Sequence, residues 1–286
     1  MSTVYDKHVD RIIELALVED ISCGDITSRI LISPDQYGWA SIETGESGML
    51  AGGDVARKVF LKAEPTLEVD ILIEDGKWIK KGDRVITVAG YATGILKAER
   101  VALNFLSHLS GVASETVKYV TKIKNTNALI RDTRKTLPGM RLLEKYAVQL
   151  GGGQNHRLHL GDGILIKDNH IAILRHSGMS LRDIVTLVKR KAPKHMEIEI
   201  EVNTITEALE VATAGVDIIM LDNMSISEMK QVKEMLSGDA KLEVSGGVNL
   251  ENIYNVAEVG VEFISVGAIT HSAKSLDFTL MLESLK

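Results

Sequence analysis

The sequence has little cysteine, no excess of positive charge and no long apolar run, and each absence excludes a class of protein. Cys23 is the only cysteine in 286 residues, so neither an internal disulfide nor a site of several thiolates can form. The 39 acidic and 33 basic residues give a formal charge of -6, which argues against a nucleic-acid or anionic-membrane surface. No apolar run approaches the roughly 18 residues of a membrane helix. The N-terminus lacks the apolar core of a signal peptide, so a cytoplasmic location is expected.

The second half of the chain alternates between strand-like and helix-like patterns. Strands are predicted at 128–132, 163–166, 196–202, 217–222, 241–245 and 262–266, with amphipathic helices between them, such as 181–192 and 226–236. The last four strands recur about every 20 to 25 residues, the length of one strand-helix unit. Such units form a (β/α) barrel or a doubly wound sheet. We favour the barrel because no strand leads into a GxGxxG-type turn.

The first half has a different pattern. A helix is predicted at 9–20, followed by alternating strands near Trp39, near Leu67 and through 75–90, and then by a long helix from Leu96 to about Lys124. These features indicate an α+β domain with an antiparallel sheet. No low-complexity linker follows it, so tight packing between the two domains is expected.

Polar residues and glycines follow nearly every predicted strand of the second half. The ends of parallel barrel strands share one mouth, where the chemistry of such folds takes place. The residues at these ends are Arg134, Lys135, Lys167, Glu201, Asp222, Ser245, Gly246, Gly247, Gly267 and His271. A ring of this kind predicts a site.

The stretch from Asp132 to Arg157 concentrates positive charge in an acidic protein, with five Lys or Arg residues against two acids. Its centre, 139–150, is predicted as a helix on which Arg141 and Lys145 occupy a solvated face. The other cations, Arg134, Lys135, His156 and Arg157, bracket this helix. Two unpaired like charges about 4 Å apart repel by roughly 4 kcal/mol at an effective dielectric near 20. The cluster therefore predicts an anionic ligand, and arginine suits planar carboxylates.

Three other groups of mouth residues have their own chemistry. Lys167 is predicted to be either a Schiff-base lysine or a fixed cation for an acidic substrate. Glu201 and Asp222 end adjacent strands and suggest contacts to ribose hydroxyls or to Mg²⁺. Alternation puts Glu197 and Glu199 on the same face as Glu201, but only Glu201 need reach the mouth. The glycine turns after the last two strands suggest a phosphate site.

Several motifs together resemble the quinolinate phosphoribosyltransferase family over nearly the whole chain. They are LVEDISCGDITS from Leu17, AERVALNFLSHLSGVAS from Ala98, the Asp132–Arg157 stretch, DGILIKDNH, EIEVN, IIMLDNM and EVSGGV, in the order typical of the family. The block from DTRKT to HR is the most specific of them. Small departures from the pattern occur at Ser107, His108 and Ser114, away from the expected site.

The resemblance implies a fold and a set of boundaries. It implies an N-terminal α+β sandwich domain at 1–112 and an incomplete barrel of six or seven parallel strands at 113–274. A C-terminal helix at 275–286 would pack back on the first domain. A homodimer or higher homo-oligomer is implied, with Arg100 acting across the interface.

The resemblance also implies the activity and the role of each matched residue. The activity would be transfer of a phosphoribosyl group from phosphoribosyl pyrophosphate to quinolinate, with decarboxylation to nicotinate mononucleotide. Quinolinate would bind to Arg100, Arg134, His156, Arg157 and Lys167. Phosphoribosyl pyrophosphate and its Mg²⁺, held mainly by substrate, would bind near Thr133, Lys135, Glu201 and Asp222. Phosphate would bind to Ser245, Gly246, Gly247, Gly267 and His271. The catalytic residues would be Lys135, Lys167, Glu201 and Asp222.

Three alternatives stay open at this point. A related transferase-like barrel that accompanies molybdenum uptake shares the RKT and GGG motifs. A lysine-dependent aldolase barrel would use Lys167 as a Schiff base. The stretch EDGKWIKKGDRVITVAG resembles strands of lipoyl- and biotin-carrier modules, but the tight lysine hairpin of those modules is missing from it.

Overall fold

The computed structural model describes residues 3–285, which form two compact units. The first comprises residues up to 117, together with 136–152 and 269 onward, and the second comprises 118–135 and 153–268. The segment 136–152 was predicted to belong to the barrel domain, and its contacts place it in the first unit instead. None of the helices in the described part of the chain combines the length and apolarity needed to cross a membrane.

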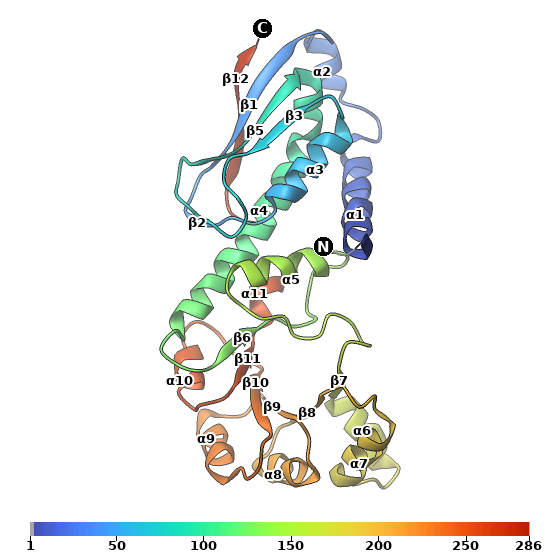
Figure 1. Ribbon diagram of the computed structural model, residues 1–286, viewed down its shortest axis with the longest axis vertical. Coiled ribbons are helices and arrows are strands. Elements are labelled where there is room, and N and C mark those ends of the chain that lie inside the picture. The colour runs from blue at the N-terminus through green and yellow to red at the C-terminus, as the bar shows by residue number, and fades with distance from the viewer. Residues whose placement is uncertain (1–2, 286) are drawn as a thin grey trace. The chain divides into compact units, whose positions relative to one another are not determined.

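The first unit contains an antiparallel sheet with helices packed around it (Figure 1). The strand order is β12 (Phe278–Leu285), β1 (Tyr37–Thr44), β5 (Arg84–Tyr91) and β3 (Glu68–Ile71), with a two-stranded sheet of β2 (Gly48–Met49) and β4 (Trp78–Ile79) beside it. The helices are α1 (Thr3–Ile21), α2 (Ile26–Leu31), α3 (Gly53–Ala63), α5 (Arg141–Leu150) and most of α4 (Ala92–Lys122). The predicted α+β domain with an antiparallel sheet is confirmed.

The core of this unit follows from apolar spacing. On β1, Ala40 and Ile42 are fully buried, and on α3 the same holds for Val59 and Phe60, which lie on one side of that helix. Burying an aromatic or branched side chain of this kind contributes about 1.5–3 kcal/mol. Buried polar groups are also paired: the Ser110 hydroxyl of α4 donates to the Ala51 carbonyl and accepts from its N–H, both at 3.0 Å.

Two sequence predictions in this unit are wrong. The C-terminal segment predicted as a helix is strand β12, which pairs with β1 along residues 278–285. The reason is a period of two, with Leu276 and Phe278 buried and the polar residues Asp277 and Thr279 exposed. On α5, Lys145 was expected on a solvated face, but it is only 2% exposed and lies beside the fully buried Glu144.

The second unit is an open barrel of six parallel strands. Their order is β6 (Leu129–Arg131), β11 (Phe263–Ser265), β10 (Lys241–Ser245), β9 (Ile218–Asp222), β8 (Ile198–Val202) and β7 (Ile164–Ile166). All six predicted strands are confirmed. The first strand β6 pairs with the last strand β11, whereas β6 and β7 do not pair within the described residues. At this gap, Gln154 bridges to Arg131 of β6.

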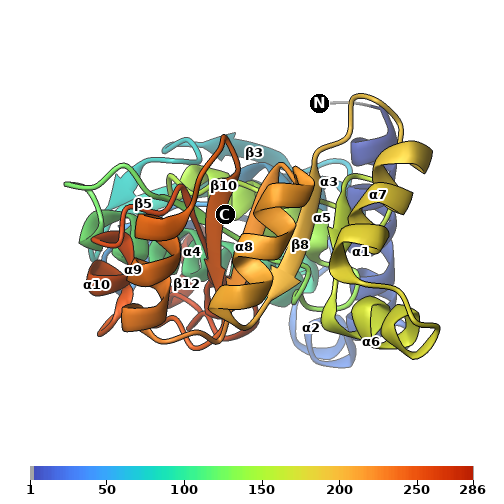
Figure 2. The same ribbon diagram turned by 90° about the horizontal axis from the view of Figure 1, so that it is seen from below.

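Helices surround these strands. They are α6 (Asp168–His176), α7 (Leu181–Lys191), α8 (Ile205–Ala214), α9 (Ile226–Met235) and α10 (Ile253–Ala257), and α11 (Ala268–His271) follows β11. Figure 2 shows α7 to α10 following one another along the outside of the strands. The helices begin at capping residues that the sequence provides, for example Ser180 before α7 and Ser225 before α9.

Two of the barrel strands, β8 and β10, alternate between apolar and charged side chains. On β8, Ile198, Ile200 and Val202 are buried against the helices, whereas Glu199 and Glu201 alternate with them. The same alternation puts Glu243 of β10 between the apolar residues Leu242 and Val244. The alternation predicted for β8 is confirmed, whereas β9 is an apolar run without charged residues before Asp222. The barrel interior therefore contains charged side chains from these two strands beside apolar ones such as Leu165 and Met220.

Candidate active site

The carboxyl ends of the barrel strands surround a cavity of about 450 Å³, which we call the mouth cavity. Its lining residues are Thr133, Arg134, Lys135, His156, Arg157, Leu165, Lys167, Asp168, Glu201, Met220, Asp222, Ser245 and Ser265. Nine of the predicted site residues are therefore brought together here. They converge because parallel strands end at the same edge of a barrel, so neighbouring strand ends meet in space.

The other predicted site residues lie elsewhere. Gly246 and Gly247 follow β10, and Gly267 lies in the turn after β11, outside the lining of the cavity. Gly246 has a φ of +84°, and a Cβ atom there would overlap the side chain of Asn223. Packing after β9 and β10 therefore requires this glycine, whatever ligand the turn binds.

Two predicted residues belong to the first unit. Arg100 lies on α4, with 64% of its side chain exposed and Nη2 3.9 Å from Glu99 Oε1. His271, predicted as part of the barrel domain, ends α11 in the segment that clusters with the first unit.

The mouth cavity has more basic than acidic side chains, five against three. Arg134 and Arg157 lie close enough to influence each other: burial and the charge of Arg134 lower the pKa of Arg157, and Glu199 and Glu201 partly oppose this. Like charges held together in this way favour an anion that can bind both. The arrangement suits a ligand with more than one negative charge.

Lys167 is the residue that precedes α6, and its ammonium forms an ion pair with Glu201. Its backbone N–H donates to Nδ1 of His170 at 2.9 Å, so His170 caps the first turn of α6. The ion pair with Glu201 links the carboxyl ends of the neighbouring strands β7 and β8 and places a carboxylate beside the ammonium group of Lys167. This supports the role of a fixed charge for an acidic ligand rather than that of a Schiff-base amine.

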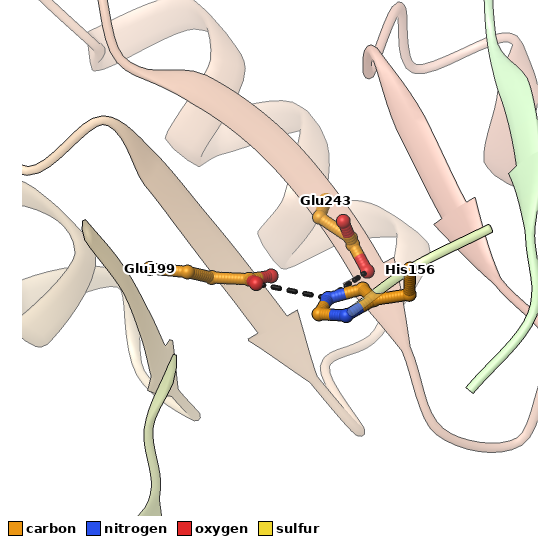
Figure 3. A group of neighbouring side chains, drawn as sticks. All are labelled: His156, Glu199 and Glu243. Carbon is orange, nitrogen blue, oxygen red and sulfur yellow. Dashed lines mark hydrogen bonds and ion pairs between the residues drawn. The ribbon is translucent and has the colours of Figure 1, made fainter. Parts of the chain in front are cut away.

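His156 lies among buried charged residues that sequence reasoning did not assign to the site (Figure 3). Its Nε2 is 2.9 Å from Glu199 Oε2 and 3.6 Å from Glu243 Oε1. Arg131 Nη1 donates to Glu243 Oε2 at 2.8 Å, and the Ser265 hydroxyl donates to the other oxygen. We call His156, Glu199, Glu243 and Arg131 the inner network.

The inner network shifts the protonation of its members. Burial alone lowers the pKa of His156, but the hydrogen bond to Glu199 and the charges of Glu199 and Glu243 outweigh it, so the pKa is raised. Burial and the charge of Glu199 raise the pKa of Glu243, against the opposing effect of His156 and Arg131. A signal for these residues was present in the sequence, because the alternation on β8 sends Glu199 inward, where a buried carboxylate needs a partner.

The residues present can be tested for a metal site. Among the described residues, one group of three possible ligands, His156, Glu199 and Glu243, has its atoms within 4.8 Å of one another. Arg131 forms an ion pair with Glu243 and so compensates part of the negative charge of this group. We therefore interpret the group as an ion-pair network. Glu201 and Asp222 belong to no such group of three within the described residues, and together they offer two carboxylates. Mg²⁺ is often bound by one or two carboxylates together with substrate phosphates and water, and these two residues fit that pattern.

A second cavity, of about 620 Å³, lies at the opposite ends of the same strands, and we call it the lower cavity. Glu197, which precedes β8, lines it together with Glu199 of β8, Ile218 of β9 and the loop around Asp162. His156 and Arg157 line both cavities. The polar interior is thus open at both ends, with the inner network between them.

The chain was compared with known proteins and structures. The family model for the C-terminal domain of quinolinate phosphoribosyl transferase matches residues 112–281, and the model for the N-terminal domain matches residues 25–110. Nicotinate-nucleotide pyrophosphorylase (carboxylating) of Mycobacterium leprae is 40% identical over 276 residues, which are 94% of this chain and 95% of the relative.

Solved structures agree with the sequence comparison. Nicotinate-nucleotide pyrophosphorylase from Ehrlichia chaffeensis is 38% identical and superimposes with a TM-score of 0.90 over 99% of both chains. The enzyme of the same name from Francisella tularensis is 37% identical, with a TM-score of 0.89 over 97% of this chain and 96% of that one. With both family domains matched and relatives of this identity along nearly its whole length, the chain belongs to the quinolinate phosphoribosyl transferase family.

Proposed function

We propose that the protein transfers the phosphoribosyl group of phosphoribosyl pyrophosphate to the ring nitrogen of quinolinate, with loss of carbon dioxide, giving nicotinate mononucleotide and pyrophosphate. The observation that carries the proposal is the mouth cavity, where five basic side chains meet Glu201 and Asp222. Quinolinate is a pyridine dicarboxylate, and phosphoribosyl pyrophosphate is more highly charged still. A site for both needs cations for the anionic groups and acids for the ribose.

The acceptor is bound by the cationic part of the mouth. Arg134, Arg157, His156 and Lys167 bind the two carboxylates and direct the ring nitrogen at the anomeric carbon. Bidentate bonds from arginine fix the plane of each carboxylate. Holding both reactants in this way removes much of the entropic barrier to a bimolecular reaction.

The acids act on the donor. As pyrophosphate leaves, the ribose gains oxocarbenium character, and Glu201 and Asp222 stabilise its developing positive charge. Lys135, which follows Thr133 in the same loop, stabilises the departing anion, and Mg²⁺ supplies further positive charge when bound with the substrate. Ser245, Gly246, Gly247, Gly267 and His271 are proposed to bind phosphate.

Decarboxylation follows from the ring chemistry. Once the ring nitrogen carries the ribose, it is positively charged and stabilises the carbanion left when the adjacent carboxylate departs as carbon dioxide. A proton added to that carbon completes the product. The chain therefore has to bind and orient the acceptor, and no further electron-withdrawing cofactor is required.

The direct test is a product assay. The protein is mixed with quinolinate, phosphoribosyl pyrophosphate and Mg²⁺, and nicotinate mononucleotide is measured by chromatography with mass detection. Nicotinate is the matched control substrate, because its single carboxylate leaves part of the cationic site unpaired, and buried unpaired charges cost several kcal/mol. We expect a kcat/KM at least about 100-fold lower with nicotinate, which corresponds to roughly 2.7 kcal/mol. Equal efficiency with both acceptors would contradict the proposal.

We further propose that the protein acts as a homodimer in which Arg100 contributes to the site of the partner subunit. An open barrel has a side that a second subunit can cover, and a two-fold dimer makes the arrangement reciprocal. The alternative is that Arg100 pairs with Glu99 in its own helix, where the distance is 3.9 Å.

Mixing two inactive variants tests this proposal. Arg100→Ala and Lys167→Ala are unfolded together and refolded, so that random pairing makes half the dimers mixed. Each mixed dimer has one complete site, and recovery should approach roughly a quarter of the wild-type activity. Each variant refolded alone is the control. If both fold, dimerise and show no recovery together, Arg100 does not act across subunits.

The cytoplasmic location stays a prediction. Relatives from Nicotiana tabacum and Arabidopsis thaliana have names that place them in mitochondria and chloroplasts.

A further inference from the structure

His156 makes hydrogen bonds through its backbone and through both ring nitrogens, and the bonds to the ring define its protonation state in this arrangement. Its backbone N–H donates to Asp132 Oδ1 at 2.8 Å. Its Nδ1 accepts the backbone N–H of Arg157 at 2.7 Å, and its Nε2 lies 2.9 Å from Glu199 Oε2. Because a backbone N–H can only donate, Nδ1 is unprotonated in this arrangement and Nε2 carries the hydrogen that Glu199 accepts. The imidazole is therefore neutral in this geometry.

The surrounding charges favour the opposite state. Two carboxylates, Glu199 and Glu243, lie within 3.6 Å of Nε2. The inner network sets one guanidinium, Arg131, against these two acids, so a proton on His156 would balance its charge. The raised pKa of His156 reflects this attraction. The remaining charged groups near the ring, Arg134, Arg157 and the Lys167–Glu201 pair, lie in the mouth cavity.

The hydrogen bonds favour a neutral His156 and the nearby carboxylates favour a protonated one. Both can be satisfied if His156 gains its proton when a ligand binds. Protonation of Nδ1 breaks the bond from the Arg157 N–H and replaces an acceptor with a donor. A carboxylate in the mouth cavity supplies the acceptor that the new N–H needs. His156 also lines the lower cavity, so water can deliver the proton from that side while the mouth is filled.

We infer that binding of the dicarboxylate substrate is accompanied by the uptake of one proton on His156. Glu199 and Glu243 act as positioning residues that stabilise the protonated imidazole. The inference rests on the proposed function, because it takes quinolinate as the ligand. Glu199 and Glu243 thereby affect substrate binding, although neither residue lines the mouth cavity.

Calorimetry measures this proton directly. Quinolinate is titrated into the wild-type protein in buffers with different ionisation enthalpies, and the slope of the observed binding enthalpy against that of the buffer gives the number of protons taken up. We expect uptake to rise toward one proton per site as the pH is raised above the pKa of His156 in the free protein. No uptake at any pH between 6 and 9.5 would overturn the inference.

Glu199→Gln is the informative variant. Within the described residues Glu199 Oε1 has no hydrogen-bond partner, so glutamine can put its amide nitrogen there and still accept from Nε2. The charge is lost but the hydrogen bond is kept. We expect proton uptake to begin at a pH about one unit lower or more, within the usual range for loss of a neighbouring charge. The KM for quinolinate should rise above that pH and return to near the wild-type value at lower pH, with a smaller change in kcat.

Glu197→Gln is the matched control. It changes the same residue type two positions earlier, just before β8, but Glu197 pairs with Lys241 at 3.1 Å and is exposed. It should leave both the uptake and the pH dependence of KM unchanged. The same change in both variants would show that loss of interior charge, and not contact with His156, is responsible.

A titration without substrate separates this inference from the proposed function. Long-range ¹H–¹⁵N spectra of the free protein, with His156 assigned through His156→Gln, report its tautomer and its pKa. We expect the neutral imidazole to carry its hydrogen on Nε2 and the pKa of His156 to lie above the ordinary value. Glu199→Gln should lower this pKa. If Glu199→Gln does not fold, Glu243→Gln serves as the second variant and should lower the pKa as well. An ordinary pKa unaffected by both changes would overturn the inference even if quinolinate is the substrate. Failure to bind quinolinate, with the pKa raised as expected, would overturn the proposed function instead.

Discussion

In the described part of the chain, each unit has a buried histidine–glutamate pair, and the two pairs have similar distances and different surroundings. In the first unit, His108 Nε2 lies 2.7 Å from Glu144 Oε1, and the other oxygen of Glu144 accepts the backbone N–H of Leu137 at 3.2 Å. In the second unit, His156 lies 2.9 Å from Glu199, faces a second acid and lines two cavities. The first pair joins α4 to the segment 136–150, and the second lies at the floor of the mouth.

The difference shows what distinguishes a structural pair from one with a role in binding. Distance and burial are nearly equal in the two cases. In the first unit both oxygens of one acid are used by the fold. In the second unit, Oε1 of Glu199 has no partner among the described residues, and Glu243 adds charge. Unequal charge beside a cavity indicates a ligand, whereas a saturated pair indicates a fixed contact.

The largest expected effect comes from breaking the structural pair. Glu144→Ala leaves His108 and the Leu137 N–H without their carboxylate, and removing one partner of a buried pair costs about 3–5 kcal/mol. We expect a fall of this size in the free energy of unfolding, measured by urea denaturation, with kcat per folded molecule within about twofold of wild type. A loss below about 1 kcal/mol would mean that the pair contributes little to the fold.

The second prediction concerns the pH dependence of stability at the other pair. The pKa of His156 is raised in the folded state, so its stabilising contribution is complete below the ordinary histidine pKa of about 6.5 and is lost as the pH rises through the raised value. Urea midpoints measured across this range should therefore fall more steeply with rising pH in the wild type than in Glu199→Gln. Parallel curves for the two proteins would contradict the prediction.

The smallest effect on stability is expected at an exposed ion pair of the second unit. Lys241 and Glu197 lie 3.1 Å apart, but their side chains are 46% and 58% exposed. Exposed ion pairs contribute about 0–1 kcal/mol. Glu197→Gln should therefore change the free energy of unfolding by less than about 0.5 kcal/mol. Both variants, Glu197→Gln and Glu144→Ala, are measured by urea denaturation. A larger loss of unfolding free energy in Glu197→Gln would show that burial does not decide how much such a pair contributes to stability.

Much of the fold and part of the site could be predicted from the sequence because both depend on local pattern. β8 and β9 were recognised from β-branched runs and turn residues, and Lys167, Glu201 and Asp222 followed from their places at strand ends. Strand ends meet in one mouth by the geometry of the barrel, so no long-range information was needed to bring these residues together.

What could not be predicted depends on register and packing between distant segments. Glu199 lies 43 residues from His156, and their contact follows only when β8 and the 153–157 segment are placed in the same barrel. The burial of Lys145 is set by neighbours of α5 in the first unit. The C-terminal strand was mistaken for a helix on the strength of a resemblance, although the alternation from Leu276 to Leu280 favoured a strand.

The strand orders also determine when the protein can fold during synthesis. β6 pairs with β11, at a separation of more than 130 residues, and β1 pairs with β12 across more than 230. Each unit thus waits for strands near the end of the chain, and contacts this distant form slowly. Until then β1 and β6 each have an unpaired edge that can add a strand from another molecule. A chain that ends before residue 263 therefore lacks the partner strands of both β1 and β6, and we expect its two open edges to favour aggregation.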